Sequence, residues 1–288
     1  MDFFQAEHRI LCGCKINIFL RITGRRDDGY HLLQSVFLPL DNPCDELLIT
    51  PGKKSGIEFY CTAPELQNEN IVVRAYEKFA LKTGFKPAIR VRLNKNIPSG
   101  AGLGGGSSDA AGMLRYLNQA AGDYSISRKD LSDLALNLGA DVPFFLQSVP
   151  ALVSGIGERI KPVSLSPRRI FGLLLCPEIH ISTHEAYKAW DSRPRECFGL
   201  KNLTNFEGGD KYTPFIHNFV LYNDFEPVVF TDNPKLAQLK LSAYQYGSCG
   251  CVMSGSGSAL AVFFRKNRSR DKFHAYVRRS GIQCYPFK

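Results

Sequence analysis

The chain has 288 residues, of which 44% are hydrophobic and 22% are charged, and its formal net charge is +9. This length suits one large domain or two ordinary domains, and the composition is that of a globular protein rather than a disordered one. Because no apolar run reaches the roughly 18–20 residues that span a bilayer, and no export signal stands at the start, we expect a cytoplasmic protein with no membrane partner.

The charge and the cysteines exclude further classes. The sequence contains no run of five Lys or Arg and no aromatic RNA-binding signature, so we expect no nucleic-acid partner and attribute the positive field to a polyanionic small molecule. The nine cysteines include the pairs Cys12/Cys14 and Cys249/Cys251, whose spacing is tighter than that of typical zinc ligands. We therefore expect reduced, buried thiols rather than disulfides or a zinc site.

Strands are predicted over most of the first 62 residues. Apolar and polar side chains alternate over residues 9–22, which places Lys15 and Asn17 together on the more polar face of a strand. The pattern further predicts a turn over residues 24–29, a second strand over 31–40, and a hairpin formed by 45–50 and 56–62.

Helices and one strand follow. The spacing of apolar residues predicts a helix over residues 70–81, and alternation predicts a strand over 88–95. After a glycine-rich stretch, helices are predicted over residues 108–120 and 129–138, each ended by a glycine.

The chain becomes rich in turns over residues 150–162, and we place a domain boundary there, which gives domains of residues 1–160 and 161–288. In the second domain we expect strands over 172–176, 249–254 and 259–265, with a turn over 255–258. We expect helices after a capping box at 182–185, over 213–230, over 233–246 and over 270–281. This mixture indicates an α+β fold.

The stretch PSGAGLGGGSSDAA, residues 98–111, places five glycines directly in front of a helix. Unpaired N–H groups at a helix N-terminus attract anions, and glycines let the backbone approach a phosphate without side chains in the way. The residues expected to form this phosphate cradle are Pro98, Gly100, Gly102, Leu103, Gly104, Gly105, Gly106, Ser107 and Ser108.

Other phosphate loops fit this stretch less well. The spacing Gly100-x-Gly102-x-x-Gly105 matches the dinucleotide fingerprint, but another helix follows where that fingerprint needs a second parallel strand. A Walker loop needs a lysine, which the stretch lacks, and the glycine loop of protein kinases lies between two strands.

The complete stretch resembles the central ATP-binding motif of the GHMP kinases, which include galactokinase, homoserine kinase and mevalonate kinase. MSGSGSA, residues 253–259, is similar to the glycine-rich third motif of that superfamily. Within the superfamily, the stretches that resemble the family of 4-diphosphocytidyl-2-C-methyl-D-erythritol kinases are KINIFLRITGRRDDGYH (15–31), NLGADVPFFL (137–146), SGIGERIKP (154–162) and YNDFEP (222–227).

The resemblance implies a two-domain GHMP kinase fold, with a ribosomal S5-like N-terminal domain and an active site in the interdomain cleft. It implies transfer of the γ-phosphoryl group of ATP to the 2-hydroxyl of 4-diphosphocytidyl-2-C-methyl-D-erythritol, in the non-mevalonate route to isoprenoid precursors. Lys15 and Asp141 match the catalytic pair: a carboxylate that takes or orients the hydroxyl proton, and a cation that stabilises the developing charge. Mg²⁺ is expected with ATP, but the sequence identifies neither its ligands nor the oligomeric state.

The resemblance also implies which residues bind the substrates. Those expected at the cytidyl substrate are Asn17, Tyr30, His31, Tyr187, Gly255, Ser256 and Gly257. Tyr30 and His31 match the base-binding pair, and Tyr187 matches the aromatic residue on the other face of the cytosine. Asn17 would hold the erythritol hydroxyls, and the glycine turn would meet the diphosphate or brace the cleft. Asn70 would touch adenine, although capping a helix explains such an asparagine equally well.

Two alternatives stay open on the sequence alone. One is another GHMP kinase that acts on a mevalonate-type or sugar substrate, against which Tyr30, His31 and the turn at residues 24–29 argue. The other is a non-catalytic nucleotide-binding protein of the same fold, which the presence of both Lys15 and Asp141 disfavours.

Overall fold

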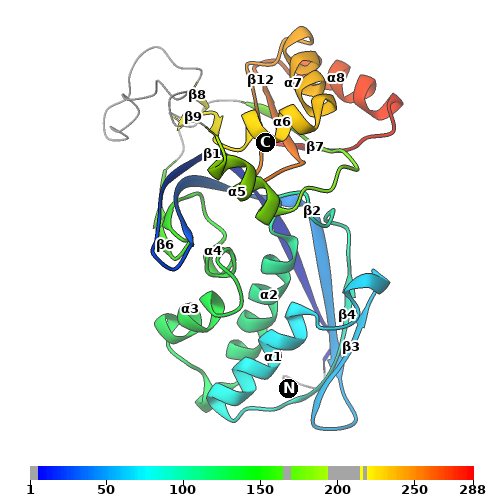
Figure 1. Cartoon of the computed structure of the whole chain (residues 1–288). Helices are drawn as coiled ribbons and strands as arrows, with labels where there is room; N and C mark the ends of the chain where they lie inside the picture. Colours follow the sequence, from blue (N-terminus) through cyan, green and yellow to red (C-terminus); the bar gives the residue numbers. More distant parts are fainter. Residues whose placement is uncertain (1–5, 165–169, 194–214, 217–218) are drawn as a thin grey trace.

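The computed structural model describes residues 6–164, 170–193, 215–216 and 219–288. The elements form two sheets, and Figure 1 shows helices α1 to α4 on one face of the first sheet and helices α6 to α8 around the second, at the opposite end of the molecule. Two long strands, β1 (His8–Arg25) and β2 (His31–Pro51), run from the far end of the first sheet to the junction. The α+β fold class is confirmed.

The first sheet has the order β10-β1-β2-β4-β3, with β5 (Ala151–Gly155) paired to β2 and β6 (Arg159–Pro162) paired to β5. The hairpin expected from residues 45–50 and 56–62 is wrong. β3 (Gly56–Cys61) pairs in parallel with β4 (Ala88–Asn94), and β4 lies between β3 and β2. The reason is the helix between β3 and β4, which provides the crossover that a parallel pair needs.

The alternation predicted for residues 9–22 holds only in part. β1 changes register between Cys12 and Cys14 and again between Asn17 and Phe19. Ile16 and Asn17 are consecutive residues in the regular stretch between these two shifts, where neighbours point to opposite faces, yet both are buried. The middle of β1 is therefore covered on both sides, and the face expected to be polar carries Lys15 and Asn17 into the interior.

Four helices cover the first sheet: α1 (Ile71–Thr83), α2 (Gly105–Ala120), α3 (Arg128–Leu136) and α4 (Val142–Gln147). Single 3₁₀ turns, Pro64–Leu66 and Gly122–Tyr124, precede α1 and follow α2. α2 begins three residues before the expected Ser108, because Gly105, Gly106 and Ser107 already form its first turn. The short α4 was not expected.

The second sheet is antiparallel, in the order β11-β12-β7-β13. Its strands are β7 (Phe171–Cys176), β11 (Gly250–Met253), β12 (Leu260–Phe264) and β13 (Gln283–Phe287), and only β13 was not expected. The helices of this half are α5 (Thr183–Asp191), α6 (Glu226–Asp232), α7 (Pro234–Gln245) and α8 (Asn267–Arg279).

The helix expected over residues 213–230 is confirmed only from Glu226 on, and it is wrong for the described residues before that point. Strands β8 (Phe215–Ile216), β9 (Phe219–Val220) and β10 (Tyr222–Asn223) precede α6. Residues 213–214 and 217–218 lie outside the described residues. β10 pairs with β1, since this position gives its backbone a partner at the open edge of the first sheet.

The two sheets share an apolar core. Ile16 and Ile18 of β1 belong to the same buried cluster as Leu174 of β7 and Phe263 of β12. The domain boundary near residue 160 stays a prediction, since β10 returns to the first sheet from beyond it. The eight cysteines in the described part of the chain are all free thiols. Within those same residues, no helix combines the length and apolarity needed to cross a bilayer.

The packing of α2 on β1 and β2 generates a stability prediction. A Cβ added at Gly112 would lie 2.7 Å from Sγ of Cys12 and 3.3 Å from Cδ1 of Leu47. We expect Gly112→Val to lower the free energy of unfolding by about 1–3 kcal/mol, because overpacking forces neighbouring side chains off their preferred rotamers. Urea denaturation measures this. The control is Gln119→Val, at an exposed site of the same helix, which should change the value by less than about 0.5 kcal/mol; equal losses would contradict the close packing.

Candidate active site

The path of the glycine loop depends on backbone positions that favour glycine. Gly100, Gly102 and Gly104 have φ values of +69°, +75° and +72°, which side chains disfavour. Gly102 is also constrained by space, since a Cβ there would lie 2.1 Å from the carbonyl oxygen of Ser254. The loop therefore lies directly against the turn that joins β11 to β12.

The loop delivers free amides at the start of α2. Gly104 is the N-cap residue and has no side chain to accept hydrogen bonds from the first turn, so the amides of Gly105, Gly106 and Ser107 have no intrahelical partner. Gly106 is exposed, and the atom nearest to a Cβ added there is 3.7 Å away. Leu103 and Ser108 are buried beneath the loop, and Pro98 is half-buried at its start. The expected phosphate cradle therefore has the required backbone, with its open side at Gly106.

Lys15 lies directly under this loop. Its backbone N–H donates to the carbonyl oxygen of Leu103 at 2.9 Å, and a Cβ added at Gly104 would lie 3.3 Å from its Cε. The Lys15 side chain is only 4% exposed, and its Nζ lies 3.5 Å from Oδ2 of Asp141. The two residues of the expected catalytic pair thus converge beside the phosphate cradle, although 126 positions separate them in the sequence.

Asp141 is held by the start of α4. It is the N-cap residue of that helix, but its side chain makes no capping hydrogen bond, so the carboxylate remains directed toward Lys15. The Asp141 side chain is 30% exposed. The carboxylate of the pair is therefore accessible to solvent, whereas the ammonium is buried.

Asn17 fixes the direction of Lys15 from behind. Its Oδ1 accepts a hydrogen bond from Lys15 Nζ at 2.7 Å, and its Nδ2 donates to Oγ of Ser35 at 2.8 Å. Ser254 Oγ accepts from the Asn17 backbone N–H and donates to the carbonyl oxygen of Gly102. Asn17 is 2% exposed, so the structure places its amide inside the protein, in contact with the catalytic candidate rather than open to solvent.

The glycine turn at 255–257 braces this arrangement from the second sheet. Asn223 Nδ2 donates to the carbonyl oxygens of Met253 and Gly255, each at 2.7 Å. Ser256 Oγ lies 2.9 Å from Oγ1 of Thr183, and the peptide bond from Gly257 to Ser258 is cis. The structure brings this turn within contact of the Gly102 backbone, as expected for residues of one site.

The aromatic candidates lie at the mouth of the site. The rings of His31 and Tyr187 stack directly, with centroids 4.4 Å apart, so no base-wide slot separates these two. Burial, followed by the nearby Asp141 carboxylate, raises the pKa of the Tyr187 hydroxyl to about 12. Tyr30 is 63% exposed, which leaves its ring open to a ligand.

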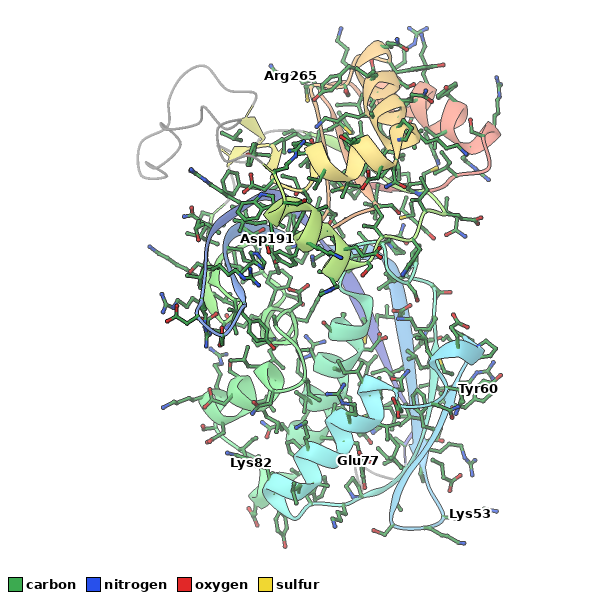
Figure 2. The ribbon with its side chains drawn as sticks, viewed as in Figure 1. Lys53, Tyr60, Glu77, Lys82, Asp191 and Arg265 are labelled. Carbon is green, nitrogen blue, oxygen red and sulfur yellow. The ribbon has the colours of Figure 1, made fainter. Side chains whose placement is uncertain are left out.

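Asp191 supports His31 from the second half of the chain. Its Oδ1 lies 2.7 Å from His31 Nε2, and its Oδ2 lies 3.4 Å from Nη1 of Arg25. Asp191 lies at the end of α5, at the junction between the two sheets (Figure 2). Sequence reasoning missed Asp191, and no local pattern singles it out.

Asn70 caps α1. Its Oδ1 accepts from the backbone N–H of Val72 at 2.9 Å, and its Nδ2 donates to the carbonyl oxygen of Leu66. Both polar groups of this side chain are therefore used within the protein. Ser35, Asn223 and Ser254 were not predicted from the sequence either. A signal existed for two of them, because Asn223 lies in the stretch 222–227 and Ser254 in the second glycine motif.

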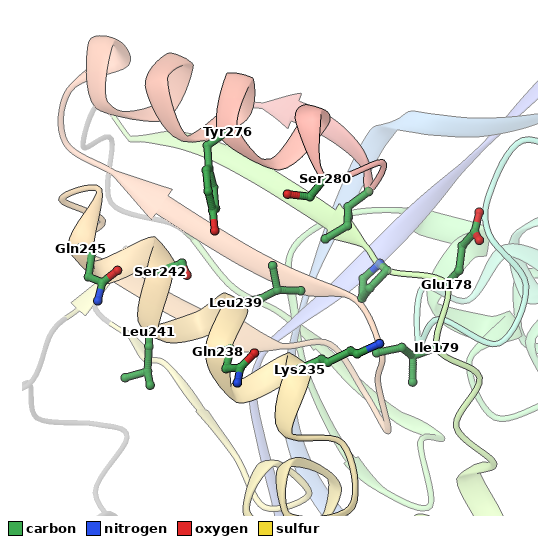
Figure 3. A pocket seen from close by; sticks show the side chains of 12 residues that line it. Glu178, Ile179, Lys235, Gln238, Leu239, Leu241, Ser242, Gln245, Tyr276 and Ser280 are labelled. Atoms are coloured by element: carbon green, nitrogen blue, oxygen red, sulfur yellow. The ribbon is translucent and has the colours of Figure 1, made fainter.

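The described part of the chain carries one cavity beside the glycine loop and a larger one away from it. A cavity of about 430 Å³ borders the glycine loop at Pro98 and Ser99, and His180 is among the residues that line it. A larger one of about 700 Å³ lies between α7 and α8, where Lys235 and Gln238 face Tyr276 and Ser280 (Figure 3). Only the first borders the glycine loop.

Comparison with known proteins agrees with this geometry. The family models described as "GHMP kinases N terminal domain" and "GHMP kinases C terminal" match residues 70–148 and 214–283. A 4-diphosphocytidyl-2-C-methyl-D-erythritol kinase of Nitratidesulfovibrio vulgaris is 40% identical over 95% of this chain and 96% of its own. The enzyme of the same name from Lawsonia intracellularis is 38% identical over 96% and 94%.

Solved structures extend the comparison. A crystal structure of 4-(cytidine 5'-diphospho)-2C-methyl-D-erythritol kinase superposes with a TM-score of 0.77 at 33% identity, covering 97% of this chain and 98% of that one. A mevalonate kinase of L. major in complex with R-mevalonate superposes with a TM-score of 0.68 at 13% identity, covering 98% and 96%, which supports the shared fold alone. From the near-complete coverage at about two-fifths identity, the chain belongs to the 4-diphosphocytidyl-2-C-methyl-D-erythritol kinase family of the GHMP kinases.

Proposed function

We propose that this chain transfers the γ-phosphoryl group of ATP to the 2-hydroxyl of 4-diphosphocytidyl-2-C-methyl-D-erythritol, giving the 2-phosphate and ADP. The observation that carries the proposal is the position of the Lys15–Asp141 pair, whose lysine lies against Gly104, the N-cap residue of α2. The relatives that share this family name support the choice of substrate.

The chemistry of phosphoryl transfer needs mainly positioning and charge stabilisation. In the proposed reaction, the amides at the start of α2 hold the triphosphate, and the Asp141 carboxylate accepts or orients the proton of the attacking hydroxyl. A new oxygen–phosphorus bond forms as the bond from the γ-phosphorus to the bridging oxygen breaks, and ADP leaves. The buried Lys15 ammonium stabilises the charge that develops on the attacking oxygen, and it needs little reorganisation because Asn17 already holds it.

Recognition of the second substrate is assigned to the junction between the sheets. We propose that the cytosine ring packs between Tyr30 and Tyr187, and that His31, held by Asp191, contacts the same base. Gly255, Ser256 and Gly257 would then contact the diphosphate. Asn17 would act mainly through Lys15, because its amide is buried.

Magnesium accompanies ATP in this proposal. Within the part of the chain that the structure describes, no group of three or more His, Cys, Asp or Glu side chains could hold a metal ion. This fits an ion that arrives on the nucleotide, where it would neutralise phosphate charge. No residue of the chain is assigned as its ligand.

The proposed substrate is tested by a coupled assay of ADP release. We expect turnover with ATP and 4-diphosphocytidyl-2-C-methyl-D-erythritol, and none above background with mevalonate, because Tyr30 offers an exposed aromatic ring on which a base can stack. Turnover with mevalonate but not with the cytidyl compound would reassign the chain to another GHMP activity.

The role of Asp141 is tested by Asp141→Asn. An amide of the same shape cannot accept the proton, so we expect kcat to fall by about 10²–10⁴-fold. The dissociation constant for ATP, measured by calorimetry, should change little because the phosphate cradle is intact. Unchanged turnover would refute the role. Asp123→Asn, at an exposed site, controls for the substitution itself.

Base recognition is tested at Tyr187. Loss of an aromatic stacking partner should raise KM for the cytidyl substrate about 5- to 100-fold in Tyr187→Ala. KM for ATP should stay the same. In Tyr187→Phe, which keeps the ring, we expect wild-type constants. A similar rise in both variants would show that the hydroxyl, and not the ring, matters.

A further inference from the structure

Three charged side chains outside the catalytic pair form a buried cluster at the base of the glycine loop. Lys95 follows β4, Asp45 lies on β2 and Asp109 lies in α2. Lys95 Nζ donates to Oδ2 of Asp45 and, at 2.8 Å, to Oδ2 of Asp109. Their side chains are 8%, 0% and 2% exposed. Burying three charged groups costs desolvation free energy, so we expect the cluster to have a specific role in the protein.

The cluster joins the two ends of the loop. Before the loop, Asp45 Oδ1 accepts from the backbone N–H groups of Asn96 and Ile97 at 2.6 and 2.8 Å. After the loop, a Cβ added at Gly105 would lie 3.3 Å from Oδ2 of the same carboxylate. Asp109 begins the next turn of α2. A single ammonium thus connects the segment that enters the loop with the helix that leaves it.

We propose that Asp45, Lys95 and Asp109 are positioning residues for the nucleotide: they fix the spacing between the two ends of the glycine loop, and the net charge of the cluster sets the affinity for the triphosphate. The inference rests on the proposed function, because it takes the loop to be the phosphate site. Lys95 also lines the cavity of about 430 Å³ that borders the loop, so the cluster lies next to the nucleotide side.

The cluster has one carboxylate more than it has cations. Oδ1 of Asp109 is buried and has no hydrogen-bond partner among the described residues. Burial first, and then Asp45, raise the pKa of Asp109 to about 7, while Lys95 opposes the shift. Burial alone would lower the pKa of Lys95, but Asp109 and Asp45 raise it above its ordinary value. Lys95 therefore stays charged while Asp109 gains or loses a proton near neutral pH.

The sign of the effect follows from the charge. Below pH 7 Asp109 is protonated and the cluster is neutral, with one carboxylate and one ammonium. As the pH rises through 7, Asp109 ionises and the cluster gains a negative charge beside the phosphates. The other titratable groups near the cluster are the thiols of Cys12 and Cys61 beside Asp109, and the thiols of Cys14 and Cys44 and the hydroxyl of Tyr285 beside Asp45; burial raises the pKa of each. ATP should therefore bind more weakly at higher pH.

The experiment measures the dissociation constant of magnesium-ATP by calorimetry for wild type and Asp109→Asn, from pH 5.5 to pH 8.5. The amide keeps an acceptor for Lys95 but carries no charge. The ratio of the two constants cancels the titration of ATP itself. We expect the ratio of the wild-type dissociation constant to that of Asp109→Asn to be near one at pH 5.5 and to rise to about three- to fivefold at pH 8.5. This is the effect of one added negative charge at roughly 10 Å from the phosphates in a partly screened site.

Further variants separate the charge effect from a folding defect. Asp45→Asn leaves one carboxylate for one ammonium, and it should flatten the pH profile as Asp109→Asn does. Lys95→Met removes the link between the loop ends and should raise KM for ATP at least tenfold, with KM for the cytidyl substrate unchanged. Asp123→Asn, exposed on the same domain, should retain the wild-type profile. Thermal unfolding of every variant confirms that it is folded.

The outcomes distinguish this inference from the proposed function. A ratio that stays constant over the pH range would overturn the charge role of Asp109. Equal rises in both KM values for Lys95→Met would overturn the positioning role. Failure of the wild type to bind magnesium-ATP at any pH would overturn the proposed function itself.

Discussion

The contact between two backbones, at Gly102 and Ser254, joins the glycine loop to the second sheet, directly beside the strand that carries Lys15. No side chain fits at Gly102, because the Ser254 carbonyl oxygen occupies the space. The Ser254 hydroxyl then donates to the Gly102 carbonyl oxygen and accepts from the backbone of Asn17, so the loop, β1 and the second sheet meet in one layer. Because Lys15 lies two residues from Asn17 on that strand, its position follows from the same contact.

The electrostatic character of the site also follows from this layer. Lys15 is nearly inaccessible to water, whereas Asp141 is about one-third exposed. In a reaction of the proposed kind, the acceptor alcohol would approach from the carboxylate side and meet an ammonium whose field is little screened by solvent. Asn17 supplies a neutral hydrogen-bond acceptor on the closed side. The ammonium thus has fixed partners before any substrate binds.

Local pattern sufficed for much of the fold and for the loop. The glycines of residues 98–108 predicted a backbone loop that leads into a helix, which the structure has, while the phosphate chemistry of the loop stays a prediction. The periodicity of α1, β4 and α7 was unambiguous. Pairing was harder: β3 and β2 are close in sequence, yet β4 lies between them because a helix returns the chain in parallel. The bulges of β1 also escaped notice, since alternation continues in the sequence when the register shifts.

The candidate site shows the same division. Lys15 and Asp141 could be identified through motifs that resemble a known family, but their distance depends on tertiary packing and was not accessible from either stretch alone. Asp191 and Ser35 lie in no recognisable motif. Their roles depend on contacts that only the fold creates, with His31 and with Asn17 respectively. The cluster of Asp45, Lys95 and Asp109 was equally hidden, because its members come from β2, the end of β4 and α2.

The pairing of β10 with β1 has a consequence for motion. A strand from late in the chain completes the edge of the early sheet, and the side chain of Asn223, within that strand, is bonded to the turn of the later sheet. Swinging the two halves apart as rigid bodies would break this ladder and open the apolar core that both sheets share. The two halves are therefore joined by backbone pairing and by a shared apolar core, and both oppose a rigid-body opening between them.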